Sequence, residues 1–292
     1  MARSRARNFY YSFVLLAGDQ KNAMCAMYAF MRFCDDLSDE SGANAAAIER
    51  WRKELADALE GRFSGNPIWP AFHDAVQRYA IPHEYFYDMI EGVRSDLEPR
   101  TIQTFNELYR YCYRVASVVG MTTMHIFGFD SPDALKLAEK CGIAFQLTNI
   151  LRDIREDAEN GRVYIPAEDI KRFGADVRLY DERFVNLMRF EASRARAYYD
   201  ESAPLIGMTH RRSRASLWAL IEIYRRLLAR IEASSFRVLE QRISVPAWQK
   251  IAIVIRAAMW GSLLRGGPAP VGAGRVKNPR HAGTLPHNHP EN

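Results

Sequence analysis

The chain has 292 residues, 48% of them hydrophobic, and its 40 basic and 35 acidic residues leave a net charge of +5. This length and apolar content allow a large core, while the mild charge, without a nucleic-acid motif or a dominant basic domain, argues against a nucleic-acid partner. Four cysteines without a CxxC pair indicate reduced core thiols in a cytoplasmic protein, and seven histidines without an HExxH spacing argue against zinc.

The first 18 residues imitate a signal peptide, with Arg3, Arg5 and Arg7 before an apolar run. That run is short, contains tyrosines and lacks a small-x-small cleavage site, so we expect it to belong to the mature protein. No later span reaches transmembrane length. We therefore expect a cytoplasmic protein; the basic start and the apolar segment 251–264 add the expectation of peripheral contact at the inner face of the cell membrane.

Helical periodicity continues along most of the chain. Apolar residues recur at spacings of three and four in segments 19–40, 43–60, 67–79, 84–96, 104–127, 132–159, 181–206, 212–238 and 246–264. Alternating β-branched runs with hairpin turns are missing, so the pattern predicts an all-α fold. No linker interrupts the first 265 residues, which predicts one domain over 1–265. Residues 266–292 are rich in Gly, Pro, His and Asn and are predicted to form a disordered tail.

Two of the predicted helices carry pairs of aspartates at positions i and i+4: Asp35 with Asp39, and Asp153 with Asp157. Four residues advance a helix by about 6 Å and turn it by about 400°, so each pair shares one face. Hard oxygen ligands without neighbouring His or Cys suit Mg²⁺, with Mn²⁺ as the alternative cation. The pairs together could hold divalent cations against a diphosphate, whereas either set alone would more often be a solvated acidic face.

Both acidic helices are apolar on several sides, which is typical of central helices whose carboxylates face a cavity. We expect a bundle with an acidic mouth and an apolar shaft, suited to a diphosphate head and a hydrocarbon tail. Arg32, Arg152 and Arg155 could share the diphosphate charge, with ion pairs to nearby Asp or Glu as the alternative for each. Aromatic side chains could stabilise a carbocation or could be plain core; the candidates are Phe9, Phe13, Tyr28, Tyr109, Tyr111 and Phe145.

These residues lie in segments that make the chain recognisable. It resembles the squalene/phytoene synthase family, the head-to-head trans-prenyl transferases of bacterial type, over roughly residues 7–265. The resemblance rests on NFYYSF at 8–13, YAFMRFCDDLSD at 28–39, YCYRVASVVG at 111–120, and QLTNILRDIRED at 146–157 followed by GRVYIP at 161–166. One departure is Asn8, where family members often carry Ser, and it puts the role of residue 8 in doubt.

The resemblance implies a single-domain isoprenoid-synthase helical bundle with a central cavity between two Asp-rich helices. It implies Mg²⁺ ligands at Asp35, Asp39, Asp153 and Asp157. It also implies that Arg32, Gln146, Asn149 and Arg152 lie at the diphosphate site, that Tyr28 and Tyr111 border the reaction centre, and that Phe9 and Phe13 line the cavity. The implied reaction joins two identical prenyl diphosphates through a cyclopropylcarbinyl diphosphate.

Several alternatives remain at this point. Residues 35–39 have the pattern DDxxD, which also fits head-to-tail prenyl transferases and terpene cyclases. A head-to-tail enzyme would be expected to repeat DDxxD in the second acidic set, but position 154 there is Ile. A noncatalytic assembly subunit would be expected to lose one acidic set. For the product we favour C30, presqualene diphosphate or a triterpene derived from it, over C40 phytoene. NADPH use is not favoured, and the oligomeric state stays open.

Overall fold

The computed structural model describes residues 13–39, 45–97 and 99–265. The predicted tail 266–292, the basic start and Phe9 lie outside the described residues. Within the described part the fold is all-α, as predicted, and its principal helices are α2 (Gly18–Asp39), α3 (Ala45–Leu59), α4 (Trp69–Tyr79), α5 (Glu84–Arg94), α6 (Phe105–Cys112), α7 (Val118–Phe127), α8 (Asp133–Glu159), α9 (Ala167–Phe173), α10 (Glu182–Glu201), α11 (Leu205–Met208), α12 (Arg214–Ala233) and α13 (Ala247–Arg265).

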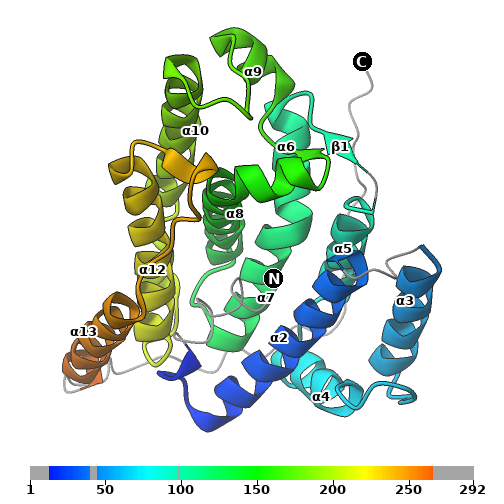
Figure 1. Ribbon diagram of the computed structural model, residues 1–292. Helices are drawn as coiled ribbons and strands as arrows, with labels where there is room; N and C mark the ends of the chain where they lie inside the picture. Colours follow the sequence, from blue (N-terminus) through cyan, green and yellow to red (C-terminus); the bar gives the residue numbers. More distant parts are fainter. Residues whose placement is uncertain (1–12, 40–44, 98, 266–292) are drawn as a thin grey trace.

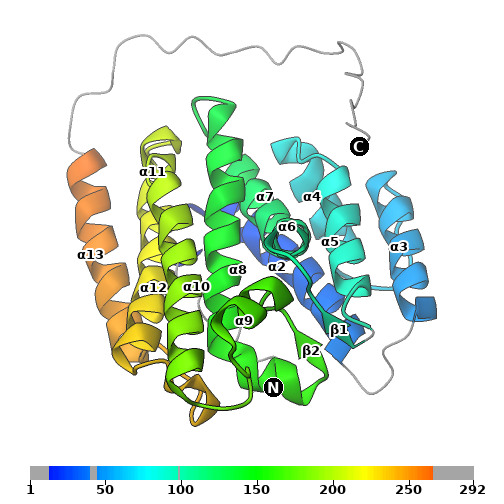
Figure 2. The same ribbon diagram turned by 90° about the horizontal axis from the view of Figure 1, so that it is seen from above.

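Helix α8 lies at the centre of the molecule (Figure 1). It packs against α10 and α12 on one side and against α6 and α7 on the other, and the view from above in Figure 2 shows the same order. Helix α13 lies at one edge, beside α12, and α3 lies at the opposite edge. A helix surrounded in this way must be apolar on most of its faces, which is why α8 lacks a single hydrophobic stripe.

An aromatic cluster joins the first helices to one another. The ring of Phe30 on α2 lies 4.8 Å from Phe72 on α4 and 5.4 Å from Phe86 on α5, and Trp51 on α3 stacks on it at 5.8 Å. These side chains are almost completely buried. Burying large aromatic groups contributes a major share of core free energy, so this cluster fixes α2 relative to α3, α4 and α5.

The predicted helix over 104–127 is interrupted. A π-helical turn, η2 (Tyr113–Ser117), separates α6 from α7. Its backbone runs so close to α8 that a Cβ on Gly142 would lie 2.5 Å from the Ser117 Cα. Single π turns inside helices often occur at functional sites, and this one forms part of the cavity wall described below.

The sequence patterns also missed two short strands, the short helix α9 and a second break. Strands β1 (Arg100–Thr101) and β2 (Arg162–Val163) pair in parallel, with Arg100 opposite Arg162. Two-residue strands are too short to show alternation, which explains why periodicity did not predict them. The predicted helix over 181–206 is divided by Pro204 into α10 and α11. Among the described helices, none is both long and apolar enough to span a bilayer.

Candidate active site

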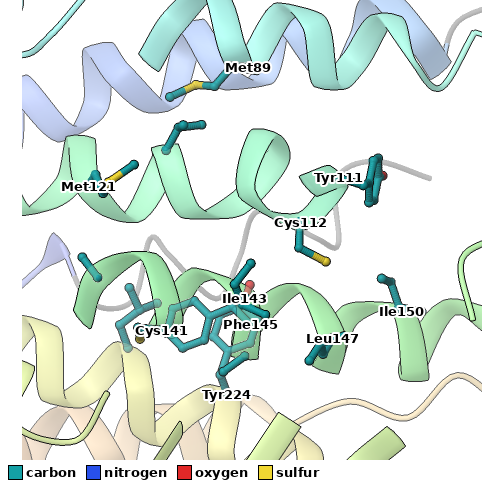
Figure 3. Close-up of a cluster of buried hydrophobic side chains, with 14 of the residues drawn as sticks. Met89, Tyr111, Cys112, Met121, Cys141, Ile143, Phe145, Leu147, Ile150 and Tyr224 are labelled. Atoms are coloured by element: carbon teal, nitrogen blue, oxygen red, sulfur yellow. The ribbon is translucent and has the colours of Figure 1, made fainter. Parts of the chain in front are cut away.

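A cavity runs between α2 and α8, the two helices that carry the aspartate pairs, as the sequence predicted. Its other walls come from α5, η2, α7 and α12. Figure 3 shows Tyr111 and Ile150 at one end of two facing helical segments, and Met121 and Cys141 towards the other end. The polar side chains of the lining come mainly from the end near Tyr111, namely Arg32, Asp96, Gln146, Asn149, Arg152, Asp153, Asp157, Arg162 and Tyr164. Most of the remaining lining is apolar, including Phe13, Met24, Met89, Val119, Met124, Phe145, Leu217 and Leu220.

One face of α8 presents amide and carboxylate groups to this cavity. Gln146, Asn149, Asp153 and Asp157 follow one another at intervals of three and four residues and all line it. The Asn149 amide donates to the Gln146 Oε1 at 3.3 Å, while its own Oδ1 is buried without a hydrogen-bond partner. A buried acceptor without a partner costs free energy, so a donor or a cation brought by a ligand would stabilise this side chain.

The Asp153 carboxylate is held by two arginines. Arg152 donates from Nε to Oδ1 at 2.8 Å and also pairs with Oδ2, and Arg242 donates from Nε to Oδ1 at 3.0 Å. Asp153 is only 4% exposed, so the pairing compensates a charge that burial would otherwise make costly. For Arg152, the ion pair expected as the alternative is therefore present, although the side chain also lines the cavity.

Arg242 was missed by the sequence analysis. It lies between η3 (Arg237–Leu239) and α13, in a segment without periodicity, and nothing in the sequence indicates that it returns to α8. Arg155, by contrast, was expected near the diphosphate and is not a lining residue. Its guanidinium donates to the backbone oxygens of Leu239 and Glu240 on the outer side of α8, because positions two residues from Asp153 and Asp157 face away from the cavity.

The first aspartate pair is described only by its backbone. Asp35 and Asp39 lie in the last turns of α2, and their side chains are outside the described set. Arg32, one turn earlier, lines the cavity and pairs with Asp36 at 2.6 Å. Among the side chains that the structure describes, no three His, Cys, Asp or Glu groups converge as metal ligands. The predicted four-aspartate site therefore stays a prediction.

A second polar cluster, which the sequence did not predict, lies in the same cavity wall. The Tyr111 hydroxyl donates to Asp96 Oδ2 at 3.0 Å, and the Tyr164 hydroxyl donates to Oδ1 at 2.7 Å. The two rings stack with centroids 4.7 Å apart. Arg162 donates to the Asp96 backbone oxygen at 2.6 Å, and the Arg100 guanidinium lies 5.5 Å from the centre of the Tyr111 ring. The β1–β2 pairing brings these arginines together.

Burial raises the pKa of the Asp96 carboxyl above its ordinary value, against the opposing effect of the hydrogen bonds from Tyr164 and Tyr111. Burial and the nearby Asp96 charge also hold the pKa of Tyr111 well above its ordinary value. The Tyr111 phenol therefore keeps its proton and is the donor in the hydrogen bond to Asp96. Asp96 gave no signal in the sequence because it follows α5 as one acidic residue among many.

The predicted aromatic walls are present in part. Phe13, Tyr28, Tyr111 and Phe145 line the cavity, and Phe145 stacks on Tyr224 with centroids 4.2 Å apart. Tyr109 does not line it; its hydroxyl bonds to Glu139 and its ring packs near Phe105 and Tyr198. Tyr109 and Tyr111 are two positions apart on a helix and point in different directions, so only one of them can face the cavity.

Comparison with known proteins gives a consistent result. The family model described as squalene/phytoene synthase matches residues 2–249. The phytoene synthase of Mycobacterium tuberculosis is 38% identical over 295 residues, covering 96% of each chain. The 15-cis-phytoene synthase of Synechococcus elongatus is 34% identical, covering 89% of this chain and 90% of the relative. A crystal structure of a dehydrosqualene synthase with a ligand is similar with a TM-score of 0.82 and 28% identity, covering 89% of this chain and 94% of the other.

Proposed function

Because the chain belongs to the squalene/phytoene synthase family, and is thus a prenyl transferase, we propose that it condenses two molecules of one prenyl diphosphate head to head through a cyclopropylcarbinyl diphosphate. The observation that carries this proposal is the form of the cavity. Carboxylates, amides and arginines gather at one part of its wall, and apolar side chains from α7, α8 and α12 line most of the rest. A diphosphate head and a long hydrocarbon chain fit these two environments.

The residues present are compatible with divalent cations. Asp153 and Asp157 supply carboxylate oxygens in the cavity wall. The Asn149 Oδ1, which is buried without a hydrogen-bond partner, is a further hard oxygen ligand on the same helix face. We propose that these residues act with Asp35 and Asp39 of α2. Bound Mg²⁺ would supply Lewis-acid stabilisation of the departing pyrophosphate. Mn²⁺ is the natural substitute because it prefers the same oxygen ligands.

The protein side chains have separate tasks in this proposal. Arg32 and Arg152 neutralise diphosphate oxygens at the mouth, and Gln146 and Asn149 hydrogen-bond to them. The ring faces of Tyr28 and Tyr111 stabilise positive charge on the prenyl chain. Phe13, at the apolar part of the wall, excludes water that would otherwise add to the cation.

For the substrate we propose the C20 diphosphate, which gives the C40 product phytoene. This revises the preference for a C30 product stated from the sequence. The revision is supported by relatives named phytoene synthase that are 34–38% identical over most of this chain. The C30 route keeps some support, since one similar solved structure is described as a dehydrosqualene synthase and another as a squalene synthase. The route to phytoene is nonreductive, so NADPH is not part of the proposal.

Peripheral membrane contact is a further part of the proposal. Helix α13 exposes four large apolar side chains at spacings of three and four residues, namely Trp248, Ile251, Ile255 and Met259. Its described part carries no acidic residue, which suits an anionic lipid surface. Co-sedimentation with anionic but not neutral vesicles is expected, and recovery in the supernatant with both would contradict this part.

The test of the proposal is product identification. Purified protein is incubated with Mg²⁺ and either farnesyl or geranylgeranyl diphosphate, with and without NADPH, and the products are identified by mass spectrometry. We expect a C40 hydrocarbon from geranylgeranyl diphosphate, unaffected by NADPH. Turnover of farnesyl diphosphate alone would contradict the C40 proposal and support the C30 alternative. Products made from a single prenyl chain would contradict head-to-head coupling.

A further inference from the structure

Helix α9 is fastened to its neighbours by a cluster of three charged side chains. Arg194 on α10 donates from Nη1 to Asp169 Oδ2 on α9 at 3.0 Å, and to Glu191 Oε2, one turn earlier on α10, at 2.7 Å. Glu191 is 1% exposed and Asp169 is 5% exposed. The guanidinium also lies 4.0 Å from the centre of the Phe105 ring, at the start of α6. The cluster therefore joins α6, α9 and α10, the three helices seen at the top of Figure 1.

The cluster has more negative than positive charge if both of its carboxyl groups are ionised. One guanidinium neutralises one carboxylate, and a second buried carboxylate without a cation is costly. Two carboxyl groups that share a site therefore keep one proton between them. A hydrogen bond joins Glu191 to Asp169, which requires such a proton, and burial raises the pKa of Glu191 from 4.5 to about 8. At neutral pH the cluster then has no net charge.

Within the described part of the chain, no other group supplies a compensating charge. Arg194 and Asp169 are the side chains that form a hydrogen bond or ion pair with Glu191, so α8 and α12, which also pack against α10, contribute none. From α6, the Cys112 thiol is close enough for Glu191 to affect it, but burial raises the pKa of that thiol and it stays neutral. Arg172 of α9 lies over an aromatic ring of α10 instead, 4.8 Å from its centre.

Helix α9 also sets the position of the cavity wall that precedes it in the chain. The Ala167 and Glu168 amides donate to the backbone oxygens of residues 102 and 103 at 2.9 and 3.1 Å, which ties the start of α9 to the segment between β1 and α6. Two residues separate α9 from Tyr164, which lines the cavity and donates to Asp96 at 2.7 Å. A movement of α9 therefore displaces Tyr164.

We propose that Glu191 and Asp169 are positioning residues whose shared proton holds α9 on α10 and so keeps Tyr164 in the cavity wall, an inference that rests on the proposed function. Loss of the proton leaves two carboxylates on one guanidinium. Their repulsion separates α9 from α10, the segment between β2 and α9 follows, and Tyr164 leaves Asp96. Coupling therefore slows above about pH 8, although neither carboxyl group lines the cavity.

Amide variants separate this role from a merely structural one. In Glu191→Gln the amide reproduces the neutral acid at every pH, and in Asp169→Asn one carboxylate remains for one guanidinium. Neither variant can acquire the second negative charge, and having two of them keeps the test decisive if one fails to fold. The control is Glu232→Gln, which removes a carboxylate from the ion pair that Arg196 of α10 forms at the surface.

The first measurement is the rate of coupled hydrocarbon formation from geranylgeranyl diphosphate with Mg²⁺ at pH 7 and pH 9. For the wild-type protein and Glu232→Gln we expect the rate at pH 9 to be about 10-fold below that at pH 7, because a group with a pKa of about 8 is mostly ionised one unit higher. For Glu191→Gln and Asp169→Asn we expect a fall of less than about 2-fold.

The second measurement is hydrogen exchange of the Ala167 and Glu168 amides, corrected for the intrinsic exchange rate at each pH. Their protection should fall between pH 7 and pH 9 in the wild-type protein and in Glu232→Gln, and should persist in both amide variants. This readout needs no substrate and no metal, so it reports the attachment of α9 directly.

A fall in rate of the wild-type size in both amide variants would overturn the proposal. Unchanged protection of the α9 amides in the wild-type protein at pH 9 would overturn it as well. Failure of the proposed function looks different, because the wild-type protein would then form no coupled product at any pH, while hydrogen exchange would still report whether the shared proton holds α9.

Discussion

Arg242 donates from Nε to Oδ1 of Asp153 at 3.0 Å across a separation of 89 residues. The contact joins the segment before α13 to the central helix α8, and it places a second guanidinium on a carboxylate that Arg152 already pairs with. The two arginines therefore hold the carboxylate in one orientation before the substrate arrives.

Replacing Arg242 tests this relationship. In Arg242→Ala, Asp153 loses one of its two arginine partners, and we expect activity to fall by about 10- to 100-fold, with a higher Mg²⁺ concentration at half-maximal rate. Arg237→Ala is the control, because Arg237 forms an exposed ion pair with Glu240 at 2.7 Å in the same region. Equal metal dependence in wild type and Arg242→Ala would contradict the role given to Arg242.

Removal of the aspartates themselves tests the metal proposal. Asp153→Asn and Asp35→Asn should each reduce metal-dependent pyrophosphate release by more than about 100-fold, since an amide neither neutralises a divalent cation nor replaces a carboxylate ligand. Asp130→Asn serves as the control, because Asp130 forms only long contacts with His210 and Arg214 at the surface. Full activity in both test variants would exclude the two-helix metal site.

The close approach of α8 to the π turn predicts a stability effect. A Cβ at Gly142 would lie 2.5 Å from the Ser117 Cα and 2.8 Å from its nitrogen, both backbone atoms that cannot move independently. Gly142→Ala should lower the free energy of unfolding by about 1–3 kcal/mol, measured by denaturant titration. Gly207→Ala meets no atom within 4 Å and should change it little. Similar values for the two variants would show that the π turn tolerates displacement.

Glu191 on α10 predicts a dependence of stability on pH. It shares Arg194 with Asp169, and burial raises its pKa from the ordinary 4.5 to about 8, with the nearby Asp169 acting in the same direction. Between these values the folded state keeps a proton that the unfolded state has released. The stabilisation is therefore complete below pH 4.5 and is lost as the pH rises towards 8.

Glu191→Gln removes this titration while keeping a similar shape. The free energy of unfolding of the wild-type protein should fall more steeply than that of Glu191→Gln between pH 5 and pH 8, as measured by urea titrations at fixed ionic strength. Parallel pH profiles for the two proteins would mean that Glu191 is already ionised in the fold.

The sequence predicted the fold class and the shared helix face of Asp153 and Asp157, because both depend on short-range patterns. Spacings of three and four residues indicate helices, and the same spacing places Asp153 and Asp157 on one face. Asp96, Tyr164 and Arg242 were not predicted because their roles come from contacts between distant segments. The interruption at Tyr113–Ser117 was missed for a related reason: the turn packs against Gly142 of α8, and such a contact leaves no periodic signal in the sequence.

The most direct measurement is the fate of both diphosphate groups when geranylgeranyl diphosphate is converted in the presence of Mg²⁺. Head-to-head coupling to a hydrocarbon releases both groups as pyrophosphate, so we predict a coupled product without phosphorus and no turnover when the cation is chelated. A coupled product that is a linear polyprenyl chain and retains a terminal diphosphate would indicate head-to-tail transfer and would contradict the central claim.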